Sequence, residues 1–264
     1  MAEQEKNIIS INGSLAGLTF YKLNGKSVVR RTYGPSKQTI NNNPAYKKTK
    51  NNNSEFAGAT YISKTIRKGL GKTGKQFQDT YMASRLTGVC RTIIANGKGE
   101  HGKKTGNLLA NPKLLVGFPL IKNRPINQRC IAKHALITKA NRNSITLSFS
   151  NIAPTDHIQT PKKASHFNIT LAIAITAPYT YHTNSKKYQP ETTVNNGYGN
   201  TVSSHLMAIN QSHQSISLSL KTTKTILHKT EAISVWLGYS YFQKSNLESL
   251  LLPNSQAMQC IAVL

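Results

Sequence analysis

Positive charge is concentrated in the first part of this chain, and this concentration restricts how the chain can fold. Residues 1–142 carry 26 lysines and arginines against five acidic residues, a surplus of 21, whereas residues 143–264 carry eight against four. A compact domain with such a surplus repels itself unless a partner neutralises it. A solvated basic surface is the alternative, but solubility needs a net charge of only about 2–8. We therefore expect a polyanionic partner, with phosphate as the first choice.

The composition indicates a folded chain without metal or disulfide support. The 264 residues, 38% of them hydrophobic, suffice for one large domain or two ordinary ones with buried cores. Cys90, Cys130 and Cys260 are odd in number, widely spaced and without a C-x-x-C pair. This pattern favours buried, reduced thiols over a disulfide framework or a zinc site. We expect no metal and no cofactor.

The first 142 residues predict a β-hairpin followed by helices. Asn24-Gly25 separates two β-rich runs within residues 8–33, and Asn-Gly is a strong signal for a two-residue hairpin turn. The asparagine-rich residues 36–53 indicate a polar loop or arm. Helical spacing follows from Ser54, a candidate N-cap, to about Gly69, and again over residues 78–95. A glycine- and lysine-rich stretch between the two helices predicts a flexible basic connector.

The remaining residues predict antiparallel strands. Residues 145–149, 167–175, 215–220 and 232–241 alternate apolar residues with serine or threonine, a period of two that is typical of half-buried strands. The fold class that we expect is α+β and mostly β. It comprises an N-terminal β-hairpin with two helices and a C-terminal antiparallel β-sandwich of immunoglobulin-like type. We place the domain boundary between a basic nucleic-acid-facing region, 1–142, and a sandwich assembly domain, 143–264.

The motifs of common enzymes are incomplete in this sequence. Residues 97–105 read GKGEHGKKT and resemble a nucleotide-triphosphate loop, but Lys104 stands where Ser or Thr would bind magnesium. Nine scattered acidic residues leave few pairs for acid–base catalysis. None of the eight histidines forms an H-x-x-x-H or H-E-x-x-H motif, and nothing local pairs Cys90 or Cys130 with a histidine. We expect that the protein is not an enzyme.

The basic residues themselves are the candidate binding groups. No zinc finger, basic zipper or aromatic RNA-recognition signature occurs, so we expect phosphate neutralisation without base readout. For the nearby Tyr21, Tyr33, Tyr46 and Tyr61 we favour packing over base stacking. The candidate nucleic-acid-binding residues are Arg30, Arg31, Lys47, Lys48, Lys50, Arg67, Lys68, Lys72, Lys75, Arg85, Arg91, Lys103 and Lys104.

Short motifs at both ends of the chain carry a family resemblance. They are G-x-x-x-G-x-x-x-Y-x-x-N-G-K-x-V-V-R over residues 13–30, N-N-x-E-F over 52–56, S-V-W-L-G-Y over 234–239, and the tail 255–264. In these segments the chain resembles a family of uncharacterised proteins from Bacteroidetes bacteria and their phages. The resemblance covers about the first quarter and the last eighth of the chain. It implies a phage-like or assembly component and carries over no catalytic or ligand residues. This chain is more basic than the usual member.

Together these patterns favour a self-assembling structural protein, a capsid, tube or filament subunit whose basic N-terminal half binds DNA or RNA without sequence specificity. A monomeric nucleic-acid-binding protein is the alternative, and a surface or adhesion module is the next. We expect a homo-oligomer without a membrane span, because the longest apolar run, near residues 169–177, is too short. The start of the chain is acidic and unlike a secretory signal, so we expect a cytoplasmic protein or one assembled into a released particle.

Overall fold

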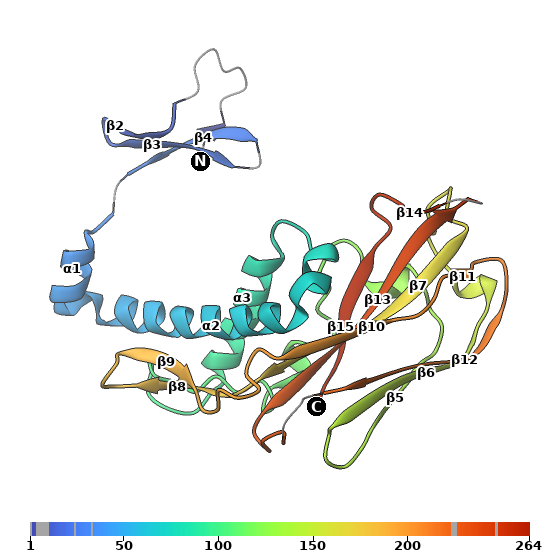
Figure 1. Ribbon diagram of the computed structural model, residues 1–264. Helices are drawn as coiled ribbons and strands as arrows, with labels where there is room; N and C mark the ends of the chain where they lie inside the picture. The colour runs from blue at the N-terminus through green and yellow to red at the C-terminus, as the bar shows by residue number, and fades with distance from the viewer. Residues whose placement is uncertain (1, 4–10, 24, 33, 223–225, 246–247) are drawn as a thin grey trace. The chain divides into compact units, whose positions relative to one another are not determined.

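The computed structural model describes residues 2–3, 11–23, 25–32, 34–222, 226–245 and 248–264. The fold is mostly β with two main helices and antiparallel sheets, as the sequence predicts. The chain divides into two compact units, Met1–Lys50 and Asn51–Leu264. Figure 1 shows the elements of each unit.

The first unit is built on a small antiparallel sheet. Its strand order is β1-β4-β3-β2, and the strands are β1 Ala2–Glu3, β2 Gly13–Leu15, β3 Leu18–Leu23 and β4 Lys26–Arg31. Strands β3 and β4 pair with Leu23 opposite Lys26, which confirms the two-residue hairpin. Gly25 has φ +81°, the left-handed conformation that this turn demands of its second residue. Asn24 and Tyr33 lie outside the described residues.

The polar stretch that we expected as a loop is helical, so that prediction was wrong. It forms α1 (Lys37–Asn42) and the 3₁₀ turn η1 (Pro44–Tyr46), and then enters α2. Short polar side chains start both turns, because Ser36 Oγ accepts a hydrogen bond from the Thr39 amide and Asn43 Oδ1 accepts one from the Ala45 amide. Two of the polar residues that indicated a loop, Ser36 and Asn43, therefore act as helix caps.

The two main helices are α2 (Lys47–Gln76) and α3 (Met82–Ala95). Helix α2 begins seven residues before Ser54, so the prediction that Ser54 is its N-cap was wrong. The Ser54 hydroxyl instead donates a hydrogen bond to the Gly102 carbonyl at 2.6 Å. The expected flexible connector is also helical, with a kink at Gly71, where φ is +54° and ψ is −132°. Such a conformation is costly for any residue with a side chain, so glycine fixes the site of the kink.

A six-stranded sheet forms the centre of the second unit. Its path is β10-β7-β13-β14, with β11 paired to β7 and β15 paired to β13. Strands β7 and β13 are buried on both faces, and their sequences are accordingly almost continuous apolar runs. The strands are β7 His166–Thr176, β10 Gly199–Ser203, β11 Met207–Ala208, β13 Ala232–Lys244, β14 Ser249–Leu251 and β15 Ala257–Val263.

A second, three-stranded sheet covers one face of the central sheet. Its order is β12-β6-β5, with strands β5 Ala135–Thr138, β6 Ser144–Ile152 and β12 His213–Lys221. Ile145, Leu147 and Phe149 of β6 share one buried cluster with alternate residues of β7 and β13. The two sheets therefore form a β-sandwich (Figure 1). The immunoglobulin-like strand arrangement stays a prediction.

Smaller elements connect these layers. The hairpin of β8 (Tyr179–His182) and β9 (Lys187–Pro190) forms a separate two-stranded sheet. Two 3₁₀ turns, η2 (Pro112–Leu114) and η3 (Ile126–Gln128), lie between α3 and β5, and a third, η4 (Pro154–Asp156), follows β6.

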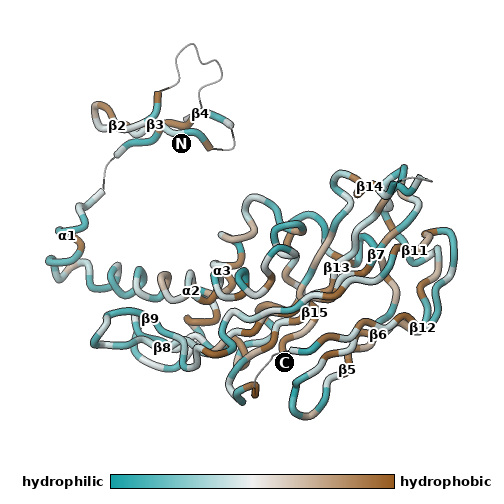
Figure 2. Tube along the Cα trace, viewed as in Figure 1, coloured by the Kyte–Doolittle hydropathy of each residue, from teal (hydrophilic) through white to brown (hydrophobic). Residues whose placement is uncertain are grey.

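The helices pack on the other face of the central sheet, where the sheet presents small residues. Apolar residues of α2 and α3 share a buried cluster with Ala172 and Ala174 of β7 and Trp236 of β13. A Cβ atom on Gly69 of α2 would lie 2.5 Å from the Cβ of Ala174, and one on Gly199 would overlap the Gly69 carbonyl. The helix backbone therefore approaches the sheet too closely for larger residues. Figure 1 shows α2 and the strands of the sheet, and Figure 2 shows brown, hydrophobic stretches along the central strands.

This packing joins segments from both sides of residue 142 in a single core. The two compact units are divided at residue 50, whereas we placed the boundary between the two functional regions at residue 142. That functional division, between a nucleic-acid-facing region and an assembly domain, stays a prediction.

Replacing Gly69 by alanine tests the close approach of helix and sheet. We expect Gly69→Ala to lower the free energy of unfolding by about 1–3 kcal/mol, because the helix must move away from Ala174. Urea denaturation followed by circular dichroism measures this change. Gly88→Ala on α3 is the control, since a Cβ there meets no atom within 4 Å, and it should raise stability by up to about 1 kcal/mol. Equal effects of the two substitutions would contradict the packing argument.

Candidate nucleic-acid interface

Several carboxylates that could neutralise the surplus charge instead accept hydrogen bonds from main-chain amides. The chain has nine acidic residues. Four of them accept hydrogen bonds from main-chain amides: Glu55 from Gly102 (2.8 Å), Asp79 from Lys122 (2.8 Å), Asp156 from Ala153 (2.8 Å) and Glu231 from His228 (2.9 Å). Between residues that the structure describes, ion pairs join Arg85 to Asp79 and Lys103 to Glu100. Most cations therefore have no carboxylate opposite them.

Five cations of α2 surround one hollow, which we call the cationic pocket. It has a volume of about 470 Å³. Lys64, Lys68, Lys72 and Lys75 are exposed and Arg67 is half-buried. Like charges that lie one helical turn apart, such as Lys64 and Lys68, destabilise a helix by about 0.2–0.5 kcal/mol per pair. The five cations are Lys64, Arg67, Lys68, Lys72 and Lys75.

The kink at Gly71 gives the pocket its concave form. Beyond Gly71 the chain turns, so Gly74 and Lys75 line the same hollow as Lys64, which precedes the kink. Leu70 of α2 and Met82 of α3 are almost fully buried and form apolar walls. The lysine stems add methylene groups to these walls while their ammonium groups stay in water.

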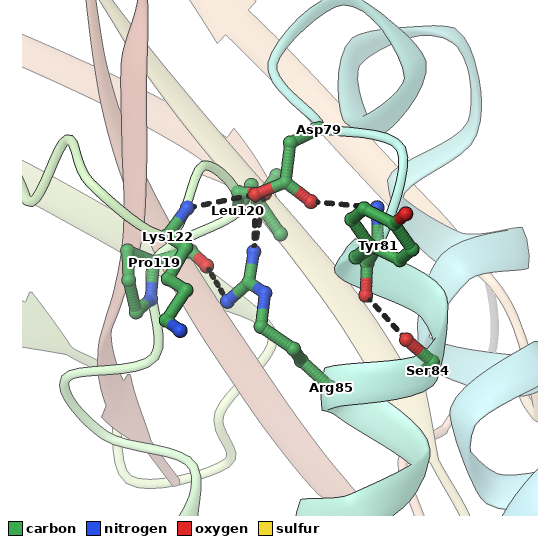
Figure 3. A network of polar contacts seen from close by, with 7 residues as sticks. All are labelled: Asp79, Tyr81, Ser84, Arg85, Pro119, Leu120 and Lys122. Atoms are coloured by element: carbon green, nitrogen blue, oxygen red, sulfur yellow. Dashed lines mark hydrogen bonds and ion pairs between the residues drawn. The ribbon is translucent and has the colours of Figure 1, made fainter. Parts of the chain in front are cut away.

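The turn between α2 and α3 is held by a polar network around Asp79 (Figure 3). Asp79 pairs with Arg85 at 2.8 Å and accepts hydrogen bonds from the amides of Tyr81 and Lys122. Burial alone would raise the pKa of Asp79, but the Lys122 amide and the Arg85 charge outweigh it, so this pKa lies below its ordinary value. The network fixes the edge of the pocket that Gln78 and Met82 form.

The Arg85 guanidinium makes its hydrogen bonds within this network. Its guanidinium donates to the carbonyls of Pro119 (3.0 Å) and Leu120 (2.9 Å) and lies 5.0 Å from the centre of the Phe118 ring. A phosphate could bind Arg85 only by displacing these partners. We therefore leave it out of the interface that we propose below.

The other sequence-predicted cations of the second unit lie apart from the pocket lining. Arg91 is exposed on α3. Lys103 pairs with Glu100 at 3.6 Å, and Lys104 Nζ donates to the Ala95 carbonyl at 2.7 Å. The structure thus brings Arg67, Lys68, Lys72 and Lys75 together and adds Lys64, which we did not select. The spacing of four residues between Lys64, Lys68 and Lys72 was the signal that could have identified it.

The remaining candidates belong to the first unit. Arg30 and Arg31 are exposed at the end of β4, and the guanidinium carbon of Arg30 lies 5.8 Å from the centre of the Tyr21 ring. Lys47 and Lys48 are exposed in the first turn of α2, and Lys50 Nζ donates to the Asn41 carbonyl at 3.1 Å. Within this unit the cations lie on both the sheet and the helical segment.

Tyrosine side chains show packing in two described cases. Tyr61 stacks parallel to Tyr179, with ring centres 6.5 Å apart. Tyr21 lies beneath Arg30. Tyr61 remains 38% exposed, so one part of its ring faces solvent on α2.

The segment that resembles a phosphate loop is closed by internal contacts. Thr105 N donates to the Lys98 carbonyl at 2.8 Å, and Lys103 N donates to the Glu100 carbonyl at 2.9 Å. The Gly102 amide is bound by the Glu55 carboxylate, a negative group in the position that a phosphate would need. This geometry favours the interpretation of residues 97–105 as a structural loop.

A buried cysteine, Cys130, and a half-buried histidine, His157, lie opposite each other in segments that flank the sandwich. Cys130 and His157 are bridge partners in the backbone, and His157 Nδ1 lies 3.1 Å from the Tyr241 hydroxyl. Burial raises the pKa of the Cys130 thiol and lowers the pKa of His157 to about 4. A nucleophilic cysteine needs the opposite shift, toward the thiolate. The pair is therefore suited to packing.

Burial of the thiols predicts their reactivity. Cys90, Cys130 and Cys260 are all buried, and burial raises the pKa of Cys90 to about 12. We expect no rapid reaction of the native protein with Ellman's reagent at pH 8, and full reaction of all three thiols in denaturant. Absorbance of the released thionitrobenzoate measures both. A thiol that reacts in the native state within the mixing time would instead indicate an accessible nucleophile.

Comparison with known proteins adds no family. No family model matches the chain, and no curated protein matches its sequence. In the described part of the chain, no group of three or more histidine, cysteine, aspartate or glutamate side chains is placed to hold a metal ion. No helix among the described residues is both long and apolar enough to cross a membrane.

Proposed function

We propose that this protein is a non-enzymatic structural subunit that binds DNA or RNA without sequence specificity through its exposed cations. The observation that carries the proposal is the cationic pocket on α2, where five cations gather with no carboxylate among the lining residues. A phosphodiester chain supplies the missing negative charge and releases its own counterions on binding. The exposed Arg30, Arg31, Lys47 and Lys48 of the first unit supply further phosphate contacts.

A merely solvated surface explains this arrangement less well. Solubility is served by scattered charges of either sign, whereas Lys64 and Lys68 lie one helical turn apart, a spacing that costs stability, and the kink at Gly71 brings further cations to the same hollow. Four of the nine carboxylates are bound by backbone amides, and none of the described carboxylates lines the cationic pocket, so the repulsion there is not relieved by a described acidic residue of the lining. An external polyanion relieves it.

The salt dependence of binding tests this function. We expect replacement of Lys64, Lys68, Lys72 and Lys75 by glutamine to reduce the slope of log K against log salt by up to about 3.6 for duplex DNA, since each neutralised phosphate contributes about 0.9. Filter binding over a salt series measures the slope. Glutamine at Lys133, Lys139, Lys162 and Lys163, which are exposed on or near the sandwich, is the matched control and should change it little. Equal slopes for the two variants would contradict the interface.

The first-unit cations are tested in the same assay. Glutamine at Arg30, Arg31, Lys47, Lys48 and Lys50 should lower the slope by several units as well. An unchanged slope would remove the first unit from the interface and leave the cations of the cationic pocket in it.

We also propose that the protein assembles with copies of itself, on the basis of the small sheet in the first unit. Among the described apolar residues of that unit, only Val28 is buried. Leu15 and Leu23 are 66% and 42% exposed. A sheet with so small a core is marginally stable by itself and gains stability from a further apolar surface. In a repeated assembly, a neighbouring subunit supplies that surface.

Light scattering coupled to size exclusion tests assembly. We expect the full chain to elute as particles larger than a monomer, and Leu15→Asp with Leu23→Asp to shift it toward the monomer because charge disfavours apolar association. Ile137→Asp on β5, also a highly exposed site at 61%, is the control and should leave the mass unchanged. A wild-type monomer that still binds nucleic acid would favour the monomeric binding protein over the assembled one. A monomer that binds none would favour the surface or adhesion module.

A further inference from the structure

The cationic pocket has the form of a site for a nucleotide rather than for a phosphate group alone. Its volume of about 470 Å³ lies within the range of roughly 300–1,000 Å³ that is typical of small-molecule sites. Its walls are mostly apolar, since Leu70, Met82 and the lysine stems line it. Phosphate binding by itself needs charge and amides but no apolar recess. An apolar recess with a cationic rim suits a nucleobase with its phosphate.

Arg67 is the side chain best placed to hold a base. It is half-buried in the lining, between the exposed lysines and the apolar wall. Its Nε is buried and has no hydrogen-bond partner among the described residues. A guanidinium is planar and weakly hydrated, and it stacks on aromatic rings or binds phosphate through two N–H groups. A ligand that offers both a ring and a phosphate matches both capacities.

The polar groups at the rim do not select one base. Gln78 is the uncharged polar side chain of the lining, and it is exposed. Its amide can donate to or accept from the edge of any base. The recess therefore accommodates bases without reading their identity, which agrees with binding that is independent of sequence.

We propose that the cationic pocket receives one unstacked nucleotide of a single-stranded nucleic acid, with the base in the recess against Arg67 and the flanking phosphates on Lys64, Lys68, Lys72 and Lys75. This inference rests on the proposed nucleic-acid binding and deepens it. A duplex keeps its bases stacked and paired, so it could fill the recess only after a base is flipped out, at a cost of a few kcal/mol. The protein should accordingly prefer single strands.

Competition between strands tests the proposal. A fluorescent thymidylate oligomer of about a dozen nucleotides is bound to the full chain and displaced by unlabelled single strand or by duplex of the same length. We expect the single strand to compete roughly tenfold better at equal salt, the effect of holding about one base. Thymidine monophosphate should likewise displace the oligomer better than inorganic phosphate at equal concentration.

The variant Arg67→Lys distinguishes binding of a base in the recess from attraction between charges alone. This variant keeps the positive charge, so its salt slope should match that of the wild type, while its preference for single strands and its response to thymidine monophosphate should fall several-fold. Lys64→Arg is the matched control on the rim and should retain both. A thermal melt establishes that each variant is folded. If Arg67→Lys does not fold, the nucleotide competition on the wild type still supports or overturns the proposal.

The outcomes distinguish this inference from the function on which it rests. If single strand and duplex bind equally and thymidine monophosphate competes no better than phosphate, the nucleotide recess is refuted while nucleic-acid binding stands. If neither nucleic acid binds at low salt, the proposed function itself fails. A single-strand preference that Arg67→Lys abolishes at an unchanged salt slope supports both.

Discussion

The close approach of α2 to the six-stranded sheet is the contact on which the rest of the second unit depends. Gly69 and Gly199 lack side chains where the two backbones meet, and Ala174 presents only a methyl group. This contact fixes which side of α2 faces the sheet. The opposite side, with Lys64, Lys68 and their neighbours, is then held toward solvent. Packing thus imposes an arrangement of cations that electrostatics alone would disfavour.

The distribution of the carboxylates follows from the small number of acids in the chain. Glu55, Asp156 and Glu231 satisfy main-chain amides in loops and turns, where an unpaired buried N–H would be costly. Asp79 combines an amide role with its ion pair to Arg85. These four acidic residues therefore stabilise the fold, whereas most of the described basic residues remain on its surface. This separation of roles is the physical basis of the proposed partner.

The two units differ in how much of their apolar surface is covered. The central sheet is covered on both faces, with apolar side chains of β7 facing the second sheet and its alanines facing the helices. The first unit has little core of its own, and its described sheet ends in the exposed Arg30 and Arg31. In our proposal the first unit thus contributes to both roles, with apolar side chains for assembly and arginines for nucleic acid. Neither role requires a catalytic group.

Periodicity in the sequence was sufficient for the regular elements. The alternation along residues 145–149, the Asn24-Gly25 turn and the helical spacing over residues 78–95 all predicted elements that the structure contains, although α3 begins only at Met82. In these segments the local pattern and the final packing agree, because each apolar stripe faces a core. Residues 232–241 do form a strand, but the half-buried face predicted there was wrong, because both faces of β13 are covered.

Only the tertiary structure decided where the charges act. Residues 36–53 looked like a loop because asparagine disfavours helix interiors, yet Ser36 and Asn43 cap α1 and η1, and Lys47 to Asn53 form the start of α2. Arg85 looked like a surface cation until its contacts with Pro119 and Leu120, far along the chain, were known. The kink at Gly71 gathers five cations around a hollow that linear spacing cannot show. Local sequence determines which elements form, whereas the use of each charge depends on contacts between distant segments.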